Sequence, residues 1–376
     1  MKILVIRNAW RHQDFGGAEE LALSLVSTLN ALGVETKLLS GGEALLNRAR
    51  SLSVPYIKGP FSKRQILTKH RAVFLLKYLF DLCRARSQYI KIFKTEAPSV
   101  IHCTGQQDSI AATSAARKLN IPVIWSDHGE LKNSIGFKLL PPWGIPGILL
   151  KKQMRHIYAI FMVNSADIAF VRKVCPESII KVVPNGVVDC YDKNKKRGND
   201  LVFASRIIRE KGIFELLNAF ELLSINYPDL RLIIAGEGPS LDEVKAFVAK
   251  NPTLKISFAE YSDTFIQTAG VFVLPTYTEA QSLALLKAMM FQVPIVTTRI
   301  DGNLHFLKDS ENALLVEPKN SKHLAKALSE LLDDTLLQKK IREHARKDYK
   351  NKYSLTTIVK EYYLGTYESL VGKESH

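Results

Sequence analysis

The sequence has few features that would tie it to a metal, a disulfide framework or a membrane span. Its 376 residues include only four cysteines, with no Cys-x-x-Cys pair, and there is no Asp-x-Asp pair. Reduced thiols are expected, and a divalent cation has no obvious carboxylate ligands. The longest uncharged apolar stretch, residues 139–150, contains three prolines and is shorter than the ~20 residues that a spanning helix needs. We predict a cytoplasmic protein without a bound metal, cofactor or transmembrane helix.

Positive charge is distributed unevenly. The formal net charge is +15, and residues 1–184 hold 26 Lys and Arg against 12 Asp and Glu. This half is therefore expected to meet an anionic partner. Within residues 58–94, basic side chains alternate with apolar ones and Asp81 is the only acid. The pattern predicts peripheral docking on the anionic inner face of the cell membrane, and a core helix with a solvated basic face is the alternative. No nucleic acid is expected, because no recognition motif accompanies the charge.

Short apolar runs alternate with amphipathic segments along the chain. The runs predict strands at 3–6, 35–39, 100–102 and 123–125, then at 201–204, 230–235, 271–274 and 295–298. The intervening segments predict helices, among them 18–32, 213–224, 241–249 and 282–290. This alternation is typical of an α/β protein with two doubly wound parallel sheets. We place the domains at 1–184 and 185–354, because the apolar run at 182–184 gives way there to a polar linker.

Polar or glycine-rich segments follow several of these strands, at the edge where open parallel sheets bind ligands. Gly16 and Gly17 precede the first helix, where backbone N–H groups favour an anion, although a plain tight turn has the same composition. Arg206 and Lys211 follow the strand at 201–204 and form a candidate clamp for a diphosphate. Solvated loop charges are the alternative for these two cations.

Two further loops of the second half have the same placement. Gly236 and Gly238 end the strand at 230–235, where they also suit a simple turn. Glu279 and Ser282 lie between the strand at 271–274 and the next helix. Because three successive strands end in such loops, their convergence predicts one binding crevice. In the first half, His128 follows the strand at 123–125 and is either a site residue or a core or capping histidine.

An ordered set of motifs now identifies a family. The chain resembles the retaining glycosyltransferases of family 4, whose GT-B fold has two Rossmann-like domains facing across a cleft. The resemblance covers nearly the whole chain and is strongest from Val182 to Pro318. The motifs are Gly16-Gly17-Ala18-Glu19, Ser126-Asp127-His128-Gly129, Pro184-Asn185-Gly186-Val187, Ser205-Arg206 with Glu210-Lys211-Gly212, Gly236-Glu237-Gly238-Pro239, and Leu274-Pro275-Thr276-Tyr277-Thr278-Glu279.

The resemblance implies a sugar transfer from a UDP- or GDP-sugar to a glycan or lipid-linked acceptor, in surface polysaccharide or lipopolysaccharide biosynthesis. Cations on the departing diphosphate would stabilise its developing negative charge. The segment 355–372 would return to the first domain. The implied catalytic residues are His128, Arg206, Lys211 and Glu279, and the implied donor-binding residues are Gly16, Gly17, Gly236, Gly238, Ser282 and Lys287.

The sequence departs from the family at Lys287. The family usually carries there a second glutamate, eight positions after the first, which receives the ribose hydroxyls of the nucleotide. An ammonium group cannot accept those hydrogen bonds. Lys287 would instead donate to ribose oxygens or to phosphate, or extend past the pocket to water. The alternative function is therefore a non-catalytic, glycosyltransferase-like subunit that binds a glycan or a partner enzyme.

Overall fold

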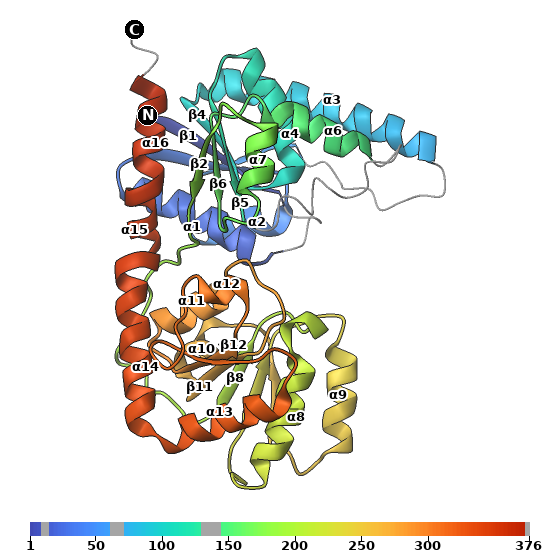
Figure 1. Cartoon of the computed structure of the whole chain (residues 1–376). Coiled ribbons are helices and arrows are strands. Elements are labelled where there is room, and N and C mark those ends of the chain that lie inside the picture. The colour runs from blue at the N-terminus through green and yellow to red at the C-terminus, as the bar shows by residue number, and fades with distance from the viewer. Residues whose placement is uncertain (9–14, 61–70, 129–143, 373–376) are drawn as a thin grey trace. The chain divides into compact units, whose positions relative to one another are not determined.

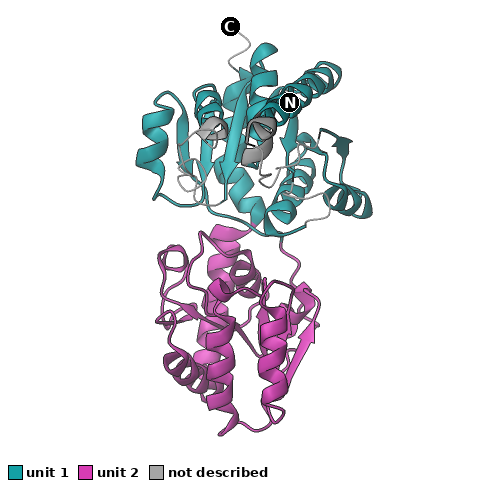
Figure 2. Cartoon of the chain, turned by 90° about the vertical axis from the view of Figure 1, so that its right-hand side faces the viewer, with its two compact units in different colours: residues 1–188, 355–376 teal, residues 189–354 magenta. Residues whose placement is uncertain are grey.

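The computed structural model contains two compact α/β units (Figures 1 and 2). The structure describes residues 1–8, 15–60, 71–128 and 144–372. Unit 1 comprises residues 1–188 with 355–376, and unit 2 comprises residues 189–354. The chain thus leaves unit 1 after Val188, a few residues beyond the predicted boundary at residue 184, and re-enters it at Leu355.

Unit 1 is built on a seven-stranded parallel sheet with the strand order β3-β2-β1-β4-β5-β6-β7. The strands are β1 (Lys2–Ile6), β2 (Glu35–Ser40), β3 (Tyr56–Lys58), β4 (Val100–Cys103), β5 (Val123–Asp127), β6 (Ala159–Met162) and β7 (Ile179–Val182). The helices before the carboxyl-terminal segment include α1 (Gly17–Ala31), α2 (Glu43–Ser51), α3 (Arg71–Glu96), α4 (Gln106–Lys118), α6 (Gly144–Met154) and α7 (Ile168–Val174).

Helices cover both faces of this sheet, and most side chains of its central strands are buried and apolar. Leu4 and Ile6 of β1 pack in one core cluster with Tyr89 and Phe93 of α3. Because side chains alternate along a strand, His102 of β4 faces the other side from Ile101 and Cys103, which belong to that cluster. Figure 1 shows α3 running beside α4 and α6, away from the carboxyl-terminal helix. Of the basic segment 58–94, residues 61–70 lie outside the described residues.

The last segment of the chain packs on unit 1. It consists of α15 (Leu355–Ile358), a π-helical stretch (Val359–Leu364) and α16 (Gly365–Val371). The backbone N–H of Leu355 donates to the carbonyl of Val187, at 2.9 Å. A Cβ on Gly186 would lie 2.9 Å from the Cα of Leu355, so only glycine allows this approach. Lys181 of β7 donates to the Thr366 hydroxyl, at 2.8 Å.

His102 connects the centre of the sheet to this segment. Its Nδ1 lies 2.7 Å from the Tyr367 hydroxyl and its Nε2 lies 2.6 Å from the Ser126 hydroxyl. The rings of Phe161 and Tyr363 pack beside the imidazole. Complete burial lowers the pKa of His102 to about 3, with a smaller contribution from His128. The imidazole is therefore neutral at physiological pH, held between two hydroxyl groups.

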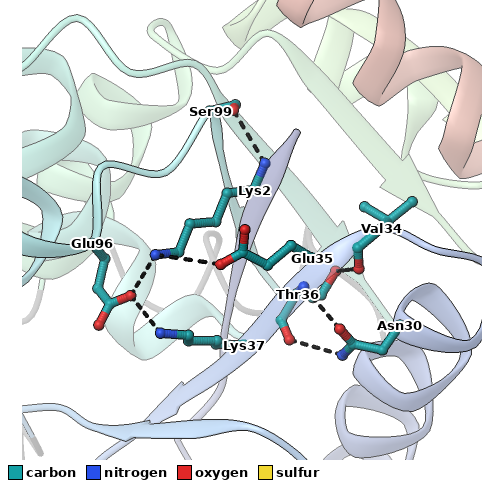
Figure 3. Close-up of polar contacts among 8 residues, drawn as sticks. All are labelled: Lys2, Asn30, Val34, Glu35, Thr36, Lys37, Glu96 and Ser99. Atoms are coloured by element: carbon teal, nitrogen blue, oxygen red, sulfur yellow. Dashed lines mark hydrogen bonds and ion pairs between the residues drawn. The ribbon is translucent and has the colours of Figure 1, made fainter.

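An ion-pair network connects β1 and β2 to the end of α3 (Figure 3). The Glu96 carboxylate, at the end of α3, accepts from the ammonium groups of Lys2 and Lys37, at 2.7 and 2.8 Å. The hydrogen bond from Lys2 is the main reason that the pKa of Glu96 is lowered. The backbone N–H of Lys2 also donates to the Ser99 hydroxyl. One carboxylate thus joins both strands to the helix that precedes β4.

Unit 2 is built on a six-stranded parallel sheet with the order β10-β9-β8-β11-β12-β13, so the predicted α/β class with two doubly wound sheets is confirmed. The strands are β8 (Leu201–Ala204), β9 (Leu232–Ala235), β10 (Ile256–Ala259), β11 (Val271–Leu274), β12 (Ile295–Thr298) and β13 (Leu314–Val316). The helices are α8 (Ile213–Ser224), α9 (Leu241–Lys250), α10 (Asp263–Thr268), α11 (Leu283–Met290), α12 (Asp301–Leu304), α13 (Ser321–Asp333) and α14 (Thr335–Asp348).

The neighbours of β8 are β9 and β11, so the direction of chain winding reverses at β8. Ligands of open α/β sheets bind at such a switch point, outside the carboxyl ends of the strands. The fold therefore directs attention to the loops that follow β8, β9 and β11.

Acidification should destabilise unit 1 through His102. The folded pKa of about 3 lies below the ordinary value of 6.5, so the unfolded chain binds the proton more readily between these values. The contribution of the neutral His102 to the free energy of unfolding is present above pH 6.5 and is lost progressively as the pH falls towards 3. Between pH 7 and pH 5 the loss should be about 2 kcal/mol from this residue.

This loss can be measured by urea unfolding followed by tryptophan fluorescence, since all three tryptophans precede residue 188. His102→Gln keeps a donor and an acceptor but removes the titration, and should lose clearly less stability on acidification. His305→Gln, at an exposed position of unit 2, is the control and should behave as the wild type. Equal acid sensitivity of the wild type and His102→Gln would contradict this account.

Candidate functional site

The loop after β8 presents cations at the switch point of unit 2. It ends in a short 3₁₀ turn, Arg209–Lys211, before α8. Lys211 forms an ion pair with Glu279, from the loop after β11, and their side chains are only 16% and 15% exposed. Arg206 is exposed, and no ion pair joins it to another described residue. Two of the predicted site residues are thus in contact, and a third lies on the same loop with its charge uncompensated.

Arg209, in the same loop, has a different environment. Its guanidinium pairs with Glu243 of α9 and lies over the Phe214 ring, 4.5 Å from the ring centroid. Its side chain is 62% exposed. Arg209 therefore differs from Arg206 and Lys211, because its charge is paired at the surface with a helix outside the candidate site.

Close backbone contacts fix the loops after β8 and β11 against each other. Gly212 has φ +71°, and a Cβ there would lie 1.9 Å from the carbonyl oxygen of Pro275. The Glu210 carbonyl accepts from the Thr276 hydroxyl at 3.0 Å and from the Tyr277 N–H at 2.8 Å. The relative position of Lys211 and Glu279 is therefore set by main-chain geometry as well as by their charges.

Gly236 and Gly238 allow the loops after β8 and β9 to touch. Gly236 has φ +140°, and a Cβ there would lie 2.1 Å from the carbonyl oxygen of Ser205. A Cβ on Gly238 would lie 2.3 Å from the carbonyl oxygen of Ile207. Both glycines therefore allow a close approach between two loops, a role that simple turn chemistry does not describe, and the contacts place the loop next to the residues that flank Arg206. Donor binding by these glycines remains a prediction.

The helix after β11 contains the remaining predicted donor-binding residues. The Ser282 hydroxyl caps α11 by accepting from the Leu285 N–H, at 3.4 Å. Lys287, in the second turn, does not extend to water, which corrects one of our alternatives. The residue is 4% exposed, and its ammonium group lies 2.9 Å from Asp263 Oδ1 and 3.4 Å from the Tyr261 hydroxyl. A buried ammonium group is strongly disfavoured without a counter-charge. The ion pair with Asp263 therefore stabilises the buried conformation of the Lys287 side chain.

In unit 1, Gly16 and Gly17 are exposed at the start of α1. The Glu19 carboxylate accepts from the Gly16 N–H at 3.1 Å and from the Arg7 guanidinium at 2.7 Å. Arg7 also donates to the Thr104 carbonyl, at 2.7 Å. The Gly16 amide is thus used within the protein, whereas the N–H of Gly17 opens a helix of 15 residues and has no intrahelical acceptor.

His128 lies at the carboxyl end of β5, and its Nδ1 is 2.9 Å from Asn185 Oδ1. In the neutral ring Nδ1 then carries the proton, and Nε2 is left as an acceptor. Burial lowers the pKa of His128 to about 4, with a smaller lowering by Arg7 and an opposing effect of Asn185. Arg7, Glu19 and Asn185 belong to the site of unit 1, and the sequence analysis had not assigned them a role. The only signal in the sequence was that Glu19 and Asn185 belong to two of the family motifs, whereas Arg7 belongs to none of them.

The described residues contain no group of three or more His, Cys, Asp or Glu that could hold a metal ion. Metal independence remains a prediction. Nor does any helix within the described ranges have the length and apolar character to cross a membrane.

Each of the two units is matched by a family model of known glycosyltransferases. The family model of the Glycosyltransferase Family 4 matches residues 15–189, and that of the Glycosyl transferases group 1 matches residues 192–348. A capsular polysaccharide biosynthesis glycosyltransferase of Staphylococcus aureus is 28% identical over 165 residues, which cover 42% of this chain and 43% of that protein. One component of the human phosphatidylinositol N-acetylglucosaminyltransferase is 24% identical over 83% of this chain and 67% of that protein.

Among solved structures, Anabaena HepE in complex with UDP has a TM-score of 0.75 and 14% identity, covering 99% of this chain and all of that one. At that identity the likeness shows the fold. The two matched family models follow each other along the chain, as do the two doubly wound sheets. The chain therefore belongs to the family 4 glycosyltransferases, which have the GT-B fold.

Proposed function

We propose that this chain transfers a sugar from a nucleoside diphosphate donor to a glycan or lipid-linked acceptor, with retention of the anomeric configuration. The observation that carries the proposal is the Lys211–Glu279 ion pair together with the exposed Arg206 of the same loop, at the switch point of unit 2. Anabaena HepE, which shares the fold, has been crystallised with UDP, and this supports a nucleotide donor. The pathway is surface polysaccharide or lipopolysaccharide assembly, in keeping with the capsular relative.

The charges suit the chemistry of the step. When the glycosyl–phosphate bond breaks, positive charge develops on the sugar and negative charge on the departing diphosphate. Arg206 and Lys211 stabilise the diphosphate in the transition state. As Lys211 turns towards phosphate, the Glu279 carboxylate accepts hydrogen bonds from sugar hydroxyls. The leaving phosphate oxygen takes the proton of the acceptor hydroxyl on the same face, which retains the configuration without a covalent enzyme intermediate.

His128 supplies an acceptor in unit 1. With a pKa of about 4, its ring is neutral at pH 7, and Nε2 can accept a hydrogen bond from a donor sugar hydroxyl. The N–H of Gly17 at the start of α1 favours the phosphate side of the donor.

A peripheral membrane position for the acceptor is supported by α3. Leu76 and Phe80 are 70% and 67% exposed, and Lys77 and Arg84 beside them are exposed cations. Apolar side chains next to cations on one helix suit the interface of an anionic bilayer. The name of the human relative includes phosphatidylinositol, a lipid.

The second candidate function is a non-catalytic, glycosyltransferase-like subunit. Lys287 favours it, because a lysine replaces the carboxylate that the family uses for ribose. It predicts a protein that binds a glycan or a partner enzyme without hydrolysing or transferring any nucleotide-sugar.

Replacement of Arg206 should separate these functions. Arg206→Ala removes a charged donor to the diphosphate and should weaken nucleotide binding by about 10- to 100-fold. The test is isothermal titration with UDP, GDP and ADP, together with turnover of the corresponding nucleotide-sugars. Arg209→Ala is the matched control, since Arg209 pairs with Glu243, and should bind as the wild type. Equal affinity in Arg206→Ala would refute the clamp, and binding without any turnover would favour the non-catalytic function.

If α3 docks on a membrane, vesicle binding should depend on both its exposed apolar side chains and its cations. Leu76→Ser with Phe80→Ser should reduce co-sedimentation with phosphatidylglycerol vesicles several-fold, and binding should weaken as salt rises. Ile225→Ser with Leu336→Ser removes two equally exposed apolar side chains from unit 2 and is the control. Wild-type binding that is indifferent to salt and to anionic lipid would mean that α3 carries ordinary surface charge.

A further inference from the structure

We propose that Asp263, anchored by the buried Lys287, receives the ribose hydroxyls of the donor. This inference rests on the proposed function, because it assigns the nucleoside end of the same donor site. It concerns three residues, Tyr261, Asp263 and Lys287, which we call the ribose cluster. The cluster joins the loop after β10 to α11.

Lys287 has an unusual position for a lysine. Its side chain is 5% exposed, and the residues around it on α11, Leu285, Leu286, Ala288 and Met289, are buried apolar residues. An apolar side chain would avoid the cost of removing an ammonium group from water. A buried cation at this position is therefore best explained by what it holds, and the partner that it holds is Asp263.

Asp263 is the accessible member of the cluster. Its side chain is 35% exposed, against 5% for that of Lys287. The Lys287 ammonium and the Tyr261 hydroxyl both donate to the same oxygen, Oδ1, at 2.9 and 3.1 Å. Neither of these contacts uses Oδ2. The carboxylate is thus fixed from the protein side while it keeps accepting capacity on its exposed side.

The location matches the diphosphate loops. Tyr261 and Asp263 follow β10, and Lys287 lies on the helix that follows β11, so the cluster belongs to the same carboxyl edge of the sheet as Arg206 and Lys211. In nucleotide-binding α/β sheets, a carboxylate at this edge accepts hydrogen bonds from ribose hydroxyls. A carboxylate has two charged oxygens and can accept from both hydroxyls of a ribose, and Asp263 restores to the site the acceptor that Lys287 cannot be.

The cluster predicts a preference for ribose over 2′-deoxyribose. A hydrogen bond to a charged acceptor corresponds to about 10- to 100-fold in affinity. The nucleotide among UDP, GDP and ADP that binds best should therefore bind at least tenfold more tightly than its 2′-deoxy form. In Asp263→Asn this ratio should fall to within about twofold, whereas the wild-type ratio should remain in Asp229→Asn. Asp229 is a matched control because it pairs with Lys255 at 2.7 Å, before β9 and β10.

Lys287 acts through Asp263 and is a positioning residue. Lys287→Met should reduce the ribose preference without abolishing nucleotide binding, a change that a general loss of stability would not produce. Asp263→Asn leaves a buried ammonium beside a neutral amide and can unfold unit 2. The double variant Asp263→Asn with Lys287→Met removes that charge, and its ribose preference should also be lost. Circular dichroism and thermal melting establish that each variant is folded.

The outcomes separate this inference from the proposed function. Nucleotide binding without a ribose preference, or a preference that survives in both Asp263 variants, would overturn the ribose cluster while the donor proposal stands. If the wild type bound none of the six nucleotides, the donor proposal would fail and the cluster with it. A preference that is present in the wild type and in Asp229→Asn but absent in the Asp263 variants supports both.

Discussion

The contact between Gly212 and the carbonyl oxygen of Pro275 is the constraint on which the candidate site depends. It brings the loop after β8 so close to the loop after β11 that no side chain fits between them. The Glu210 carbonyl then accepts from both Thr276 and Tyr277, and Lys211 meets Glu279. The order of strands in the sheet makes these loops neighbours, and the absence of a Cβ sets their separation. Main-chain contacts between the two loops thus determine where the charged side chains of Lys211 and Glu279 lie.

Opposite charges are paired among the candidate site residues of each unit before any ligand is present. Glu279 neutralises Lys211, Asp263 neutralises Lys287, and in unit 1 Glu19 neutralises Arg7. Such pairs keep partly buried charges tolerable in the folded state. They also hold donors and acceptors in fixed positions, which reduces the ordering that a ligand must impose. Arg206 differs, since its side chain is exposed and no ion pair joins it to another described residue.

Much of the fold could be predicted from the sequence because fully buried strands appear in it as short apolar runs. Leu201–Ala204, Val271–Leu274 and Ile295–Thr298 were expected with these bounds. β3 and β13 were not, since three residues carry too little pattern, and β10 was missed because half of its side chains face solvent. β6 and β7 were also not predicted, although β6 is a fully buried apolar run. Lys211 and Glu279 were expected on converging loops. The Lys287–Asp263 pair could not be foreseen, because its members lie on different elements and only the folded sheet brings them together.

The return of the chain to unit 1 has a consequence for biosynthesis. His102 and Tyr367 are 265 residues apart, and the whole of unit 2 lies between them. All of unit 2 is synthesised before α16, so until then His102 and Phe161 of unit 1 lack the side chains that cover them in the folded protein. Nascent chains fold in the order in which complete units appear. The sequence of the inserted unit is therefore complete before that of the unit that begins the chain, and unit 1 can acquire its full set of contacts only after synthesis ends.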